Sequence, residues 1–176
     1  MRKPVVILGM LLTILLLAPS AAFAEGGRAL RASATLYDAS GQVIGTARLV
    51  EDATGTLRVK VNVKGLSPGL HGIHLHAVGS CAPTFAAAGG HHNPLGRQHG
   101  LDNPLGAHGG DLPNLVVNPA GVGRLAATTD RATLAPGPAT LFDADGSSII
   151  IHANPDDQLT DPTGNSGGRI ACGVIQ

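Results

Sequence analysis

Three of the eight histidines of the chain lie within seven residues, in the segment "HGIHLHA" at positions 71–77. The segment reads as a β-strand, in which successive side chains point to opposite faces. His74 and His76 would then share one face, and Ile73 and Leu75 would take the other. Two imidazoles side by side on a rigid surface are typical of a metal site, because neutral imidazole nitrogen binds zinc and copper.

The other donor residues indicate that one segment does not act alone. Four histidines lie in a stretch rich in Gly and Pro, one ends the apolar run "SIIIH", and one aspartate follows a histidine by three positions: His91, His92, His99, His108, His152 and Asp111. Histidines on strands would form a rigid set suited to copper, whereas three loop histidines and an aspartate would suit tetrahedral zinc. We expect His71 to be a structural residue hydrogen-bonded to the backbone, and we expect His92 not to be a ligand.

The elements that must position these side chains are short strands. Alternating apolar and polar residues separated by turn residues predict an all-β chain. The clearest run is "TLRVKVNVK" (56–64), with Leu and Val on one face and charged or polar residues on the other. Eight runs are predicted, at residues 31–38, 42–51, 56–64, 71–77, 114–118, 122–129, 147–153 and 169–175. Eight strands around one core favour a β-sandwich or a closed β-barrel.

Two long connections interrupt the strands, at residues 78–113 and 153–168, and loops of that length are normally functional. Cys81 and Cys172, the two cysteines of the chain, lie at the start of the first loop and just after the second. In an oxidising compartment such a pair is most simply a disulfide, which predicts that both loops are ordered and packed together. A free catalytic cysteine is the alternative.

The N-terminus predicts export. A basic start, "MRKP", precedes the apolar run "VVILGMLLTILLLA" and a small-x-small cleavage signal at Ala22–Ala24. We expect residues 1–24 to be a signal peptide and residues 25–176 to be the mature domain, located in the periplasm or secreted. An uncleaved membrane anchor is the alternative, although the apolar run is short for a membrane span. After cleavage we expect no membrane partner.

Composition argues against a nucleic-acid partner. The chain has twelve Lys and Arg against twelve Asp and Glu, so it carries no excess of positive charge. Aromatic residues make up only 2% of the chain, which leaves little surface on which bases could stack.

The motifs "GLHGIHLHAVGSC", "GHHNPLGRQHG", "AHGGDLPNL", "IIIHANPDD" and "GNSGGRIACGVI" resemble, in order and spacing, those of exported bacterial copper/zinc superoxide dismutases. The resemblance covers essentially the whole mature chain. It implies an eight-stranded Greek-key β-barrel with two functional loops. It also implies that superoxide is converted to dioxygen and hydrogen peroxide by Cu(II)/Cu(I) cycling, with a structural zinc that shares a bridging histidine.

The resemblance also implies a role for each candidate residue. The copper ligands would be His74, His76, His91 and His152. The zinc ligands would be His91, His99, His108 and Asp111, so that His91 bridges the two ions. Asp156 would hydrogen-bond one ligand of each metal, Arg169 would be the active-site arginine, and Cys81 and Cys172 would form the intrasubunit disulfide.

Some features leave alternatives open. The second loop, "QLTDPT" (158–163), lacks the lysine and glutamates thought to steer superoxide in many relatives, and Lys60, Lys64 or Arg97 could replace them. "GNSGG" (164–168) fits a serine-hydrolase pattern, but a strand follows it where a helix would be needed. A non-enzymatic periplasmic copper-binding or copper-delivery module on the same fold is the alternative function. The resemblance is compatible with a monomer or a homodimer.

Overall fold

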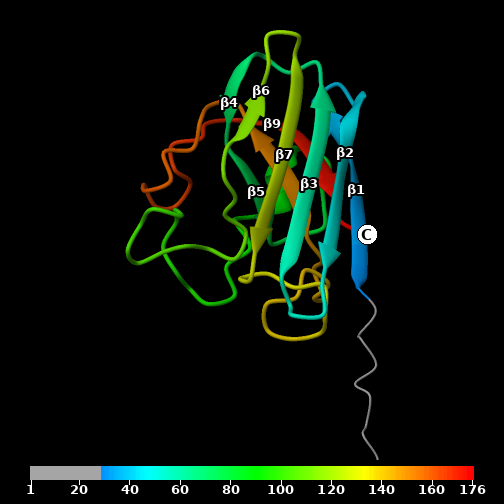
Figure 1. Ribbon diagram of the computed structural model, residues 1–176. Coiled ribbons are helices and arrows are strands. Elements are labelled where there is room, and N and C mark those ends of the chain that lie inside the picture. Colours follow the sequence, from blue (N-terminus) through cyan, green and yellow to red (C-terminus); the bar gives the residue numbers. More distant parts are fainter. Residues whose placement is uncertain (1–28) are drawn as a thin grey trace, which may run out of the picture.

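The computed structural model describes residues 29–176, so the predicted signal peptide lies outside the described residues. These residues form nine β-strands and one short 3-10 helix (Figure 1): β1 (Leu30–Asp38), β2 (Val43–Glu51), β3 (Leu57–Lys64), β4 (Gly69–His71), β5 (Ile73–His76), η1 (Phe85–Ala88), β6 (Leu115–Val117), β7 (Val122–Thr129), β8 (Ser148–His152) and β9 (Arg169–Val174). Within residues 29–176, no helix has the length and apolar character needed to cross a membrane.

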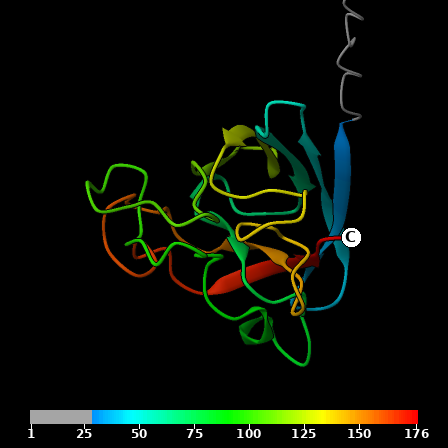
Figure 2. The same ribbon diagram turned by 90° about the horizontal axis from the view of Figure 1, so that it is seen from below.

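The strands form one antiparallel sheet with the order β4-β6-β7-β3-β2-β1-β9-β8-β5. The two strands at the ends of this order, β4 and β5, are joined in the chain by Gly72 alone, so the sheet curls into a nearly closed barrel (Figures 1 and 2). β3 pairs with β7, and β5 pairs with β8, so some neighbouring strands in the sheet are not consecutive in the chain. Such connections between non-consecutive strands are typical of a Greek key. The predicted all-β barrel class is confirmed.

The number of strands exceeds the predicted eight by one because the predicted strand 71–77 changes partners halfway. β4 pairs with β6, whereas β5 pairs with β8. Between them, the amide of Gly72 donates to Asn154 O at 2.8 Å, and Gly72 O accepts the amide of His152 at 2.8 Å. The strand therefore leaves one side of the barrel and joins the other at this glycine.

The core follows the predicted alternation. Along β3 the apolar residues Leu57, Val59, Val61 and Val63 are buried, and the charged or polar residues between them are exposed. Burying an apolar side chain of this size contributes roughly 1.5–3 kcal/mol to folding, so the alternation determines which face of the strand turns inward.

The two long loops are ordered and packed together, as predicted. The amide of Asp102 in the first loop donates to Gln158 O in the second at 3.0 Å, and Asn103 Nδ2 donates to Leu159 O at 3.1 Å. Cys81 and Cys172 form a disulfide, which confirms the predicted pairing and excludes a free catalytic cysteine. The disulfide ties the start of the first loop to β9.

Candidate metal centre

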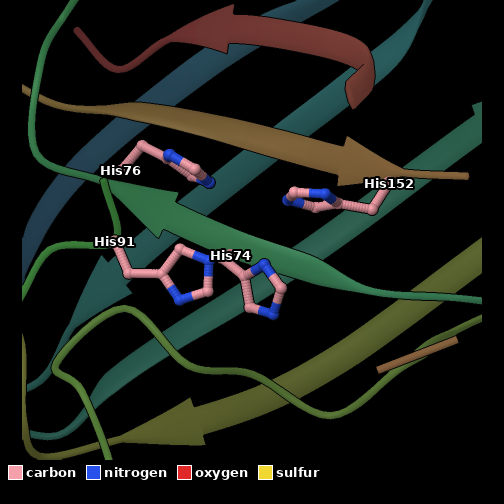
Figure 3. A group of neighbouring side chains, drawn as sticks. All are labelled: His74, His76, His91 and His152. Carbon is pink, nitrogen blue, oxygen red and sulfur yellow. The ribbon is translucent and has the colours of Figure 1, made fainter. Parts of the chain in front are cut away.

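Two paired strands supply three of the predicted ligands. β5 and β8 are neighbours, and His74 faces Ile150 while His76 faces Ser148 across the ladder. Ile73 and Leu75 belong to the hydrophobic core, so His74 and His76 point to the other face, as the alternation predicts. His152, the last residue of β8, completes a set of three imidazoles on this rigid surface (Figure 3).

The first loop returns to lie along β5 and brings further donors to the same place. The amide of His92 donates to Leu75 O, and the amide of Leu75 donates to Gly110 O, both at 2.9 Å. This places His91 opposite His76 and Asp111 opposite His74, as isolated antiparallel bridges. Backbone hydrogen bonds therefore fix both loop residues against the strand.

One group of donors consists of four histidines (Figure 3): His74, His76, His91 and His152. One nitrogen of each ring lies within 4.8 Å of the corresponding nitrogens of the others. Each ring of this group has one buried nitrogen without a hydrogen-bond partner among the described residues: His74 Nδ1, His76 Nε2, His91 Nε2 and His152 Nε2. Buried lone pairs left unpaired are unfavourable, and a shared metal ion would satisfy all four.

The opposite nitrogens of the three strand histidines are held by hydrogen bonds. His76 Nδ1 donates to Gly89 O at 3.0 Å, and His152 Nδ1 donates to Gly167 O at 3.1 Å. His74 Nε2 donates to Asp156 Oδ2 at 2.7 Å. These bonds fix each tautomer so that the other nitrogen keeps its lone pair free for a metal.

A second group of donors surrounds Asp111. Its Oδ2 accepts the backbone amides of Gly100 and His108, both at 2.9 Å, which orients the carboxylate. Its Oδ1 lies 3.0 Å from His91 Nδ1, 3.0 Å from His99 Nδ1 and 3.3 Å from His108 Nδ1. Three imidazoles and a carboxylate converging in this way match the donor set of a tetrahedral zinc site.

His74 also lies within 4.8 Å of this second group, because its ring stacks on that of His91 with the centroids 4.0 Å apart. It has one free nitrogen, since Nε2 is bound to Asp156, and so it can serve a single ion. The strand set lacks a fourth donor without His74, whereas His108 completes the Asp111 set. His74 is therefore available to complete the four-histidine group.

Asp156 connects the two groups. Its Oδ2 accepts from His74 Nε2 at 2.7 Å, and its Oδ1 accepts from His99 Nε2 at 3.0 Å. The carboxylate is buried, and its backbone is fixed by Asn114, whose Oδ1 accepts the amide of Asp156 at 2.8 Å. Asp156 thus hydrogen-bonds one histidine of each group.

Burial sets the charge state of the strand histidines. Desolvation is the main cause that lowers the pKa of His74 to about 3, that of His76 to about 2 and that of His152 to about 4. These imidazoles are therefore neutral at physiological pH, which is the form that binds a metal. The neighbouring positive charge of Arg169 also lowers the pKa of His76 and of His152.

The Asp111 group is charged differently. Burial opposes the ionised carboxyl of Asp111, but hydrogen bonds from His108 and His91 hold its pKa well below the usual value. Burial also opposes the protonated form of His99, yet Asp111 and Asp156 together raise the pKa of His99 to about 9. The two carboxylates therefore favour positive charge at this position.

The two histidines that we expect not to be ligands, His71 and His92, make hydrogen bonds to the backbone. His71 Nδ1 donates to His152 O at 2.7 Å, and its Nε2 lies 2.9 Å from Ser67 O. His92 Nε2 donates to Ala139 O at 3.2 Å. The expectation of a hydrogen-bonded His71 is confirmed, and this residue supports the backbone of His152.

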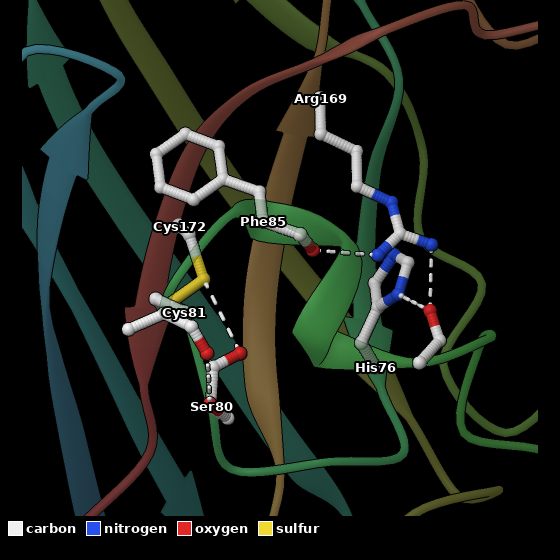
Figure 4. Close-up of a disulfide and its surroundings, with 8 residues drawn as sticks. His76, Ser80, Cys81, Phe85, Arg169 and Cys172 are labelled. Carbon is white, nitrogen blue, oxygen red and sulfur yellow. Dashed lines mark hydrogen bonds between the residues drawn. A yellow bond between two sulfur atoms is a disulfide. The ribbon is translucent and has the colours of Figure 1, made fainter.

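Arg169 begins β9 at the rim of the four-histidine group (Figure 4). Its Nη1 donates to Phe85 O at 2.7 Å and its Nη2 to Gly89 O at 2.6 Å. Gly89 O thus accepts hydrogen bonds from both His76 and Arg169. The disulfide lies beside this segment and anchors its N-terminal side through Cys81.

The structure adds one residue that sequence reasoning missed. Asp161 Oδ1 accepts the backbone amide of His99 at 2.6 Å and lies 3.7 Å from His108 Nε2. The nitrogen of His108 that faces away from Asp111 therefore also meets a carboxylate. Asp161 is one of several aspartates in the loops, and nothing in its sequence position predicts this contact.

We expect Asp161→Asn to weaken zinc binding about tenfold, because it removes the negative charge beside His108 while keeping an oxygen for the amide of His99. Zinc affinity would be measured by competition with a chromophoric chelator. Asp102→Asn, which removes an exposed carboxylate from the first loop, serves as the matched control. Equal affinities in the two variants would exclude a role for the Asp161 charge.

An antiparallel β-barrel with two adjoining histidine-rich donor sets defines a class of protein that can hold two metal ions. Residues 43–175 match the family model of copper/zinc superoxide dismutase (SODC). The chain belongs to the copper/zinc superoxide dismutase family, whose members are oxidoreductases, and the predicted family is confirmed. The two donor sets could hold the copper and zinc ions predicted as cofactors.

Individual relatives agree with this assignment. The chain is 44% identical over 164 residues to the Cu-Zn superoxide dismutase 2 of Aquifex aeolicus, covering 92% of this chain and 94% of that protein. It is 44% identical over 156 residues to the Cu-Zn superoxide dismutase of Deinococcus radiodurans, covering 81% and 82%. The crystal structure of a SOD-like protein from Bacillus subtilis superposes with a TM-score of 0.77 at 39% identity, covering 81% of this chain and 96% of that chain.

Proposed function

We propose that this protein is a superoxide dismutase that cycles between Cu(II) and Cu(I), with a structural zinc that shares His91. The observation that carries the proposal is the position of the His91 ring between the two donor sets. Its Nε2 is buried without a partner among the strand histidines. Its Nδ1 lies 3.0 Å from Asp111 Oδ1 and 3.2 Å from His108 Nδ1.

The donor atoms fit the two ions. Copper would be held by His74 Nδ1, His76 Nε2, His91 Nε2 and His152 Nε2, an all-imidazole set that suits Cu(II). Zinc would be held by His91 Nδ1, His99 Nδ1, His108 Nδ1 and Asp111 Oδ1. When bound, copper supplies the one-electron chemistry, oxidising one superoxide to dioxygen and reducing a second to peroxide.

The protein contributes the capture of the anion. The guanidinium of Arg169 is held by two carbonyl oxygens, which leaves its other N–H groups free for an incoming superoxide. Its positive charge at the rim favours an anion over water there. Lys60 and Lys64 project from β3. Three strands, β7, β6 and β4, separate β3 from β5 by the shorter way around the barrel. These two lysines therefore do not steer superoxide at close range.

The protein also manages one of the two protons that peroxide formation consumes. We assign this proton to His91 Nε2, which faces the site of reaction while Nδ1 stays held beside Asp111. The imidazole takes the proton up in one half-reaction and delivers it in the other, and solvent supplies the second proton. The ring can do this without turning, because Asp111 is fixed by the amides of Gly100 and His108.

A superoxide-decay assay on metal-analysed protein tests the proposal. Activity should follow copper content, disappear when copper is removed and return when it is restored, with zinc present throughout. Protein that holds both metals in full and leaves superoxide decay unchanged would instead be the copper-binding or copper-delivery module. One relative, from Bacillus subtilis, is named a superoxide dismutase-like protein, at 40% identity over 143 residues, which makes that outcome worth testing.

Arg169→Ala should lower the second-order rate constant about tenfold or more and flatten its dependence on salt, because the local positive charge is lost. Metal content should stay unchanged, since Arg169 is not among the donors. Arg169→Lys is the comparison, since it keeps the charge but loses the planar fork that reaches both Phe85 O and Gly89 O. Unaltered kinetics in the alanine variant would remove Arg169 from the mechanism.

We further propose that the chain is exported and loses residues 1–24, which leaves residues 25–176 to act in the periplasm or outside the cell. The disulfide supports this proposal, because such bonds persist in oxidising compartments. The intact mass of protein recovered from a bacterial host that exports it should correspond to a chain that begins at Glu25. A mass that retains the apolar run would favour the membrane-anchored alternative.

A further inference from the structure

Six of the twelve Lys and Arg residues of the chain project from one face of the barrel. They are exposed and occupy outward positions on the four consecutive strands β7, β3, β2 and β1: Arg31, Arg48, Arg58, Lys60, Lys64 and Arg124. We call this surface the cationic face. The residues that alternate with them point into the core, so their outward direction is fixed by the fold.

The strand register brings these charges close to one another. Arg48 is the direct cross-strand partner of Lys60. Arg31 and Arg58 are both partners of Val50, one on each side. Like charges directly opposite one another in a sheet are destabilising. A face arranged for stability alone would place a carboxylate opposite Lys60.

No salt bridge joins a carboxylate to this face within the described residues 29–176; the one carboxylate whose pKa the face affects is the exposed Asp52, where hydrogen bonds from Thr54 and Thr56 and, less, the charge of Arg58 lower the pKa. The only ion pair of a Lys or Arg in that part of the chain joins Arg131 to Asp130, at 3.9 Å. The nearest acidic residues lie at the strand ends, where they bind backbone amides. Asp38 Oδ1 accepts the amides of Ser40 and Gln42, and Asp52 Oδ1 accepts those of Thr54 and Thr56.

The cationic face lies away from the metal centre. In the strand order, β3 is separated from β5 by three strands in one direction and four in the other. Figure 2 shows the two long loops on one side of the barrel and β1 on the opposite side. A partner bound to the cationic face would therefore leave the metal centre open to solvent.

We propose that the cationic face docks the protein on a bilayer surface that carries anionic phospholipid headgroups. The charges spread in two dimensions over four strands, which matches an extended anionic surface better than a single polymer strand. Lys and Arg side chains are long enough to reach headgroups from a curved barrel face. This contact is peripheral, and it differs from the sequence-based expectation that the mature protein has no membrane partner.

Vesicle co-sedimentation of the metal-loaded protein recovered after export, with its mass checked to correspond to a chain that begins at Glu25, tests the proposal. The protein should bind vesicles of phosphatidylcholine mixed with phosphatidylglycerol and should not bind vesicles of phosphatidylcholine alone. Raising the ionic strength from about 0.05 M to about 0.5 M should release it, because the Debye length falls to roughly 4 Å. Equal binding to both kinds of vesicle, or binding that resists salt, would overturn the proposal.

Lys60→Glu and Arg97→Glu form a matched pair that locates the contact. Each changes the net charge by two, but Lys60 lies at the centre of the cationic face and Arg97 lies in the first loop. At about fivefold per charge near an anionic surface, Lys60→Glu should weaken vesicle binding about 25-fold, and Arg97→Glu far less. Dismutase activity of the Lys60 variant should stay unchanged, which also shows that it is folded.

Two further results would count against the proposal. Equal losses in the two variants would show that net charge acts without any defined face. Binding to a soluble polyanion such as dextran sulfate, with none to the mixed vesicles, would assign the face to a polymer instead.

Discussion

Replacing His91 with alanine should reduce dismutase activity by roughly 100-fold or more and should disturb both metal sites at once. The reason is that one ring serves both donor sets: Nε2 lies among the strand histidines, and Nδ1 lies beside Asp111. Losing a residue that only supports a ligand already lowers metal affinity 10- to 100-fold, and here a donor to each ion would be lost. Metal analysis should show lowered copper and lowered zinc in the same preparation.

His92→Ala is the control for this variant. His92 is the adjacent buried histidine and donates to Ala139 O, so its loss removes a similar volume without removing a donor nitrogen. It should retain both metals and most of the activity. If His91→Ala keeps full copper and zinc, or if it falls no further than His92→Ala, the shared ring is not the basis of the site.

Replacing both cysteines with alanine should lower the free energy of unfolding by about 4 kcal/mol, because the bond closes a long segment of chain. Cys81 and Cys172 are 91 residues apart in sequence. For a domain of this size, such a loss corresponds to a fall in Tm of roughly 10 °C. Calorimetry of the metal-loaded protein would measure it, with metal content matched between the proteins.

Reductant provides the control for the double cysteine variant. It should lower the Tm of the unaltered protein toward that of the variant and leave the variant unchanged. The same variant should lose some activity, because Cys81 anchors the segment that carries Phe85 O and Gly89 O, the acceptors of Arg169. A variant as heat-stable as the parent would show that the loops hold together without the disulfide.

Residue alternation was sufficient to predict much of the barrel and one wall of the site. Leu57 to Val63 pointed inward and their neighbours outward, and the same rule placed His74 and His76 on one face of their strand. Strand alternation is a local property of the backbone, so it can be read without knowing the partners of a strand. The sequence also shows which loop residues are potential donors, namely the loop histidines and Asp111. Their assignment to copper or zinc, however, rests on the family resemblance.

The features that escaped prediction depend on contacts between distant segments. Gly72 divides a predicted strand because Asn154 and His152, some eighty positions away, take its hydrogen bonds. Gly164 has a positive φ of 59°, and a β-carbon there would collide with Asp156 Oδ1 and His99 Nε2. The sequence showed only glycines in turns, because the bond between Asp156 and His99 that Gly164 covers exists only in the folded chain.

The carbonyl oxygen of Gly89 limits how the anion entrance could be redesigned for a different substrate. It accepts hydrogen bonds from His76 Nδ1 and from Arg169 Nη2, at 3.0 Å and 2.6 Å. The cation that would receive the anion and an imidazole of the four-histidine group therefore share one acceptor and cannot be shifted independently. An engineer who wished to admit a bulkier anion would have to redesign the turn at 85–89, since exchanging the arginine alone would leave the width of the entrance tied to the same peptide.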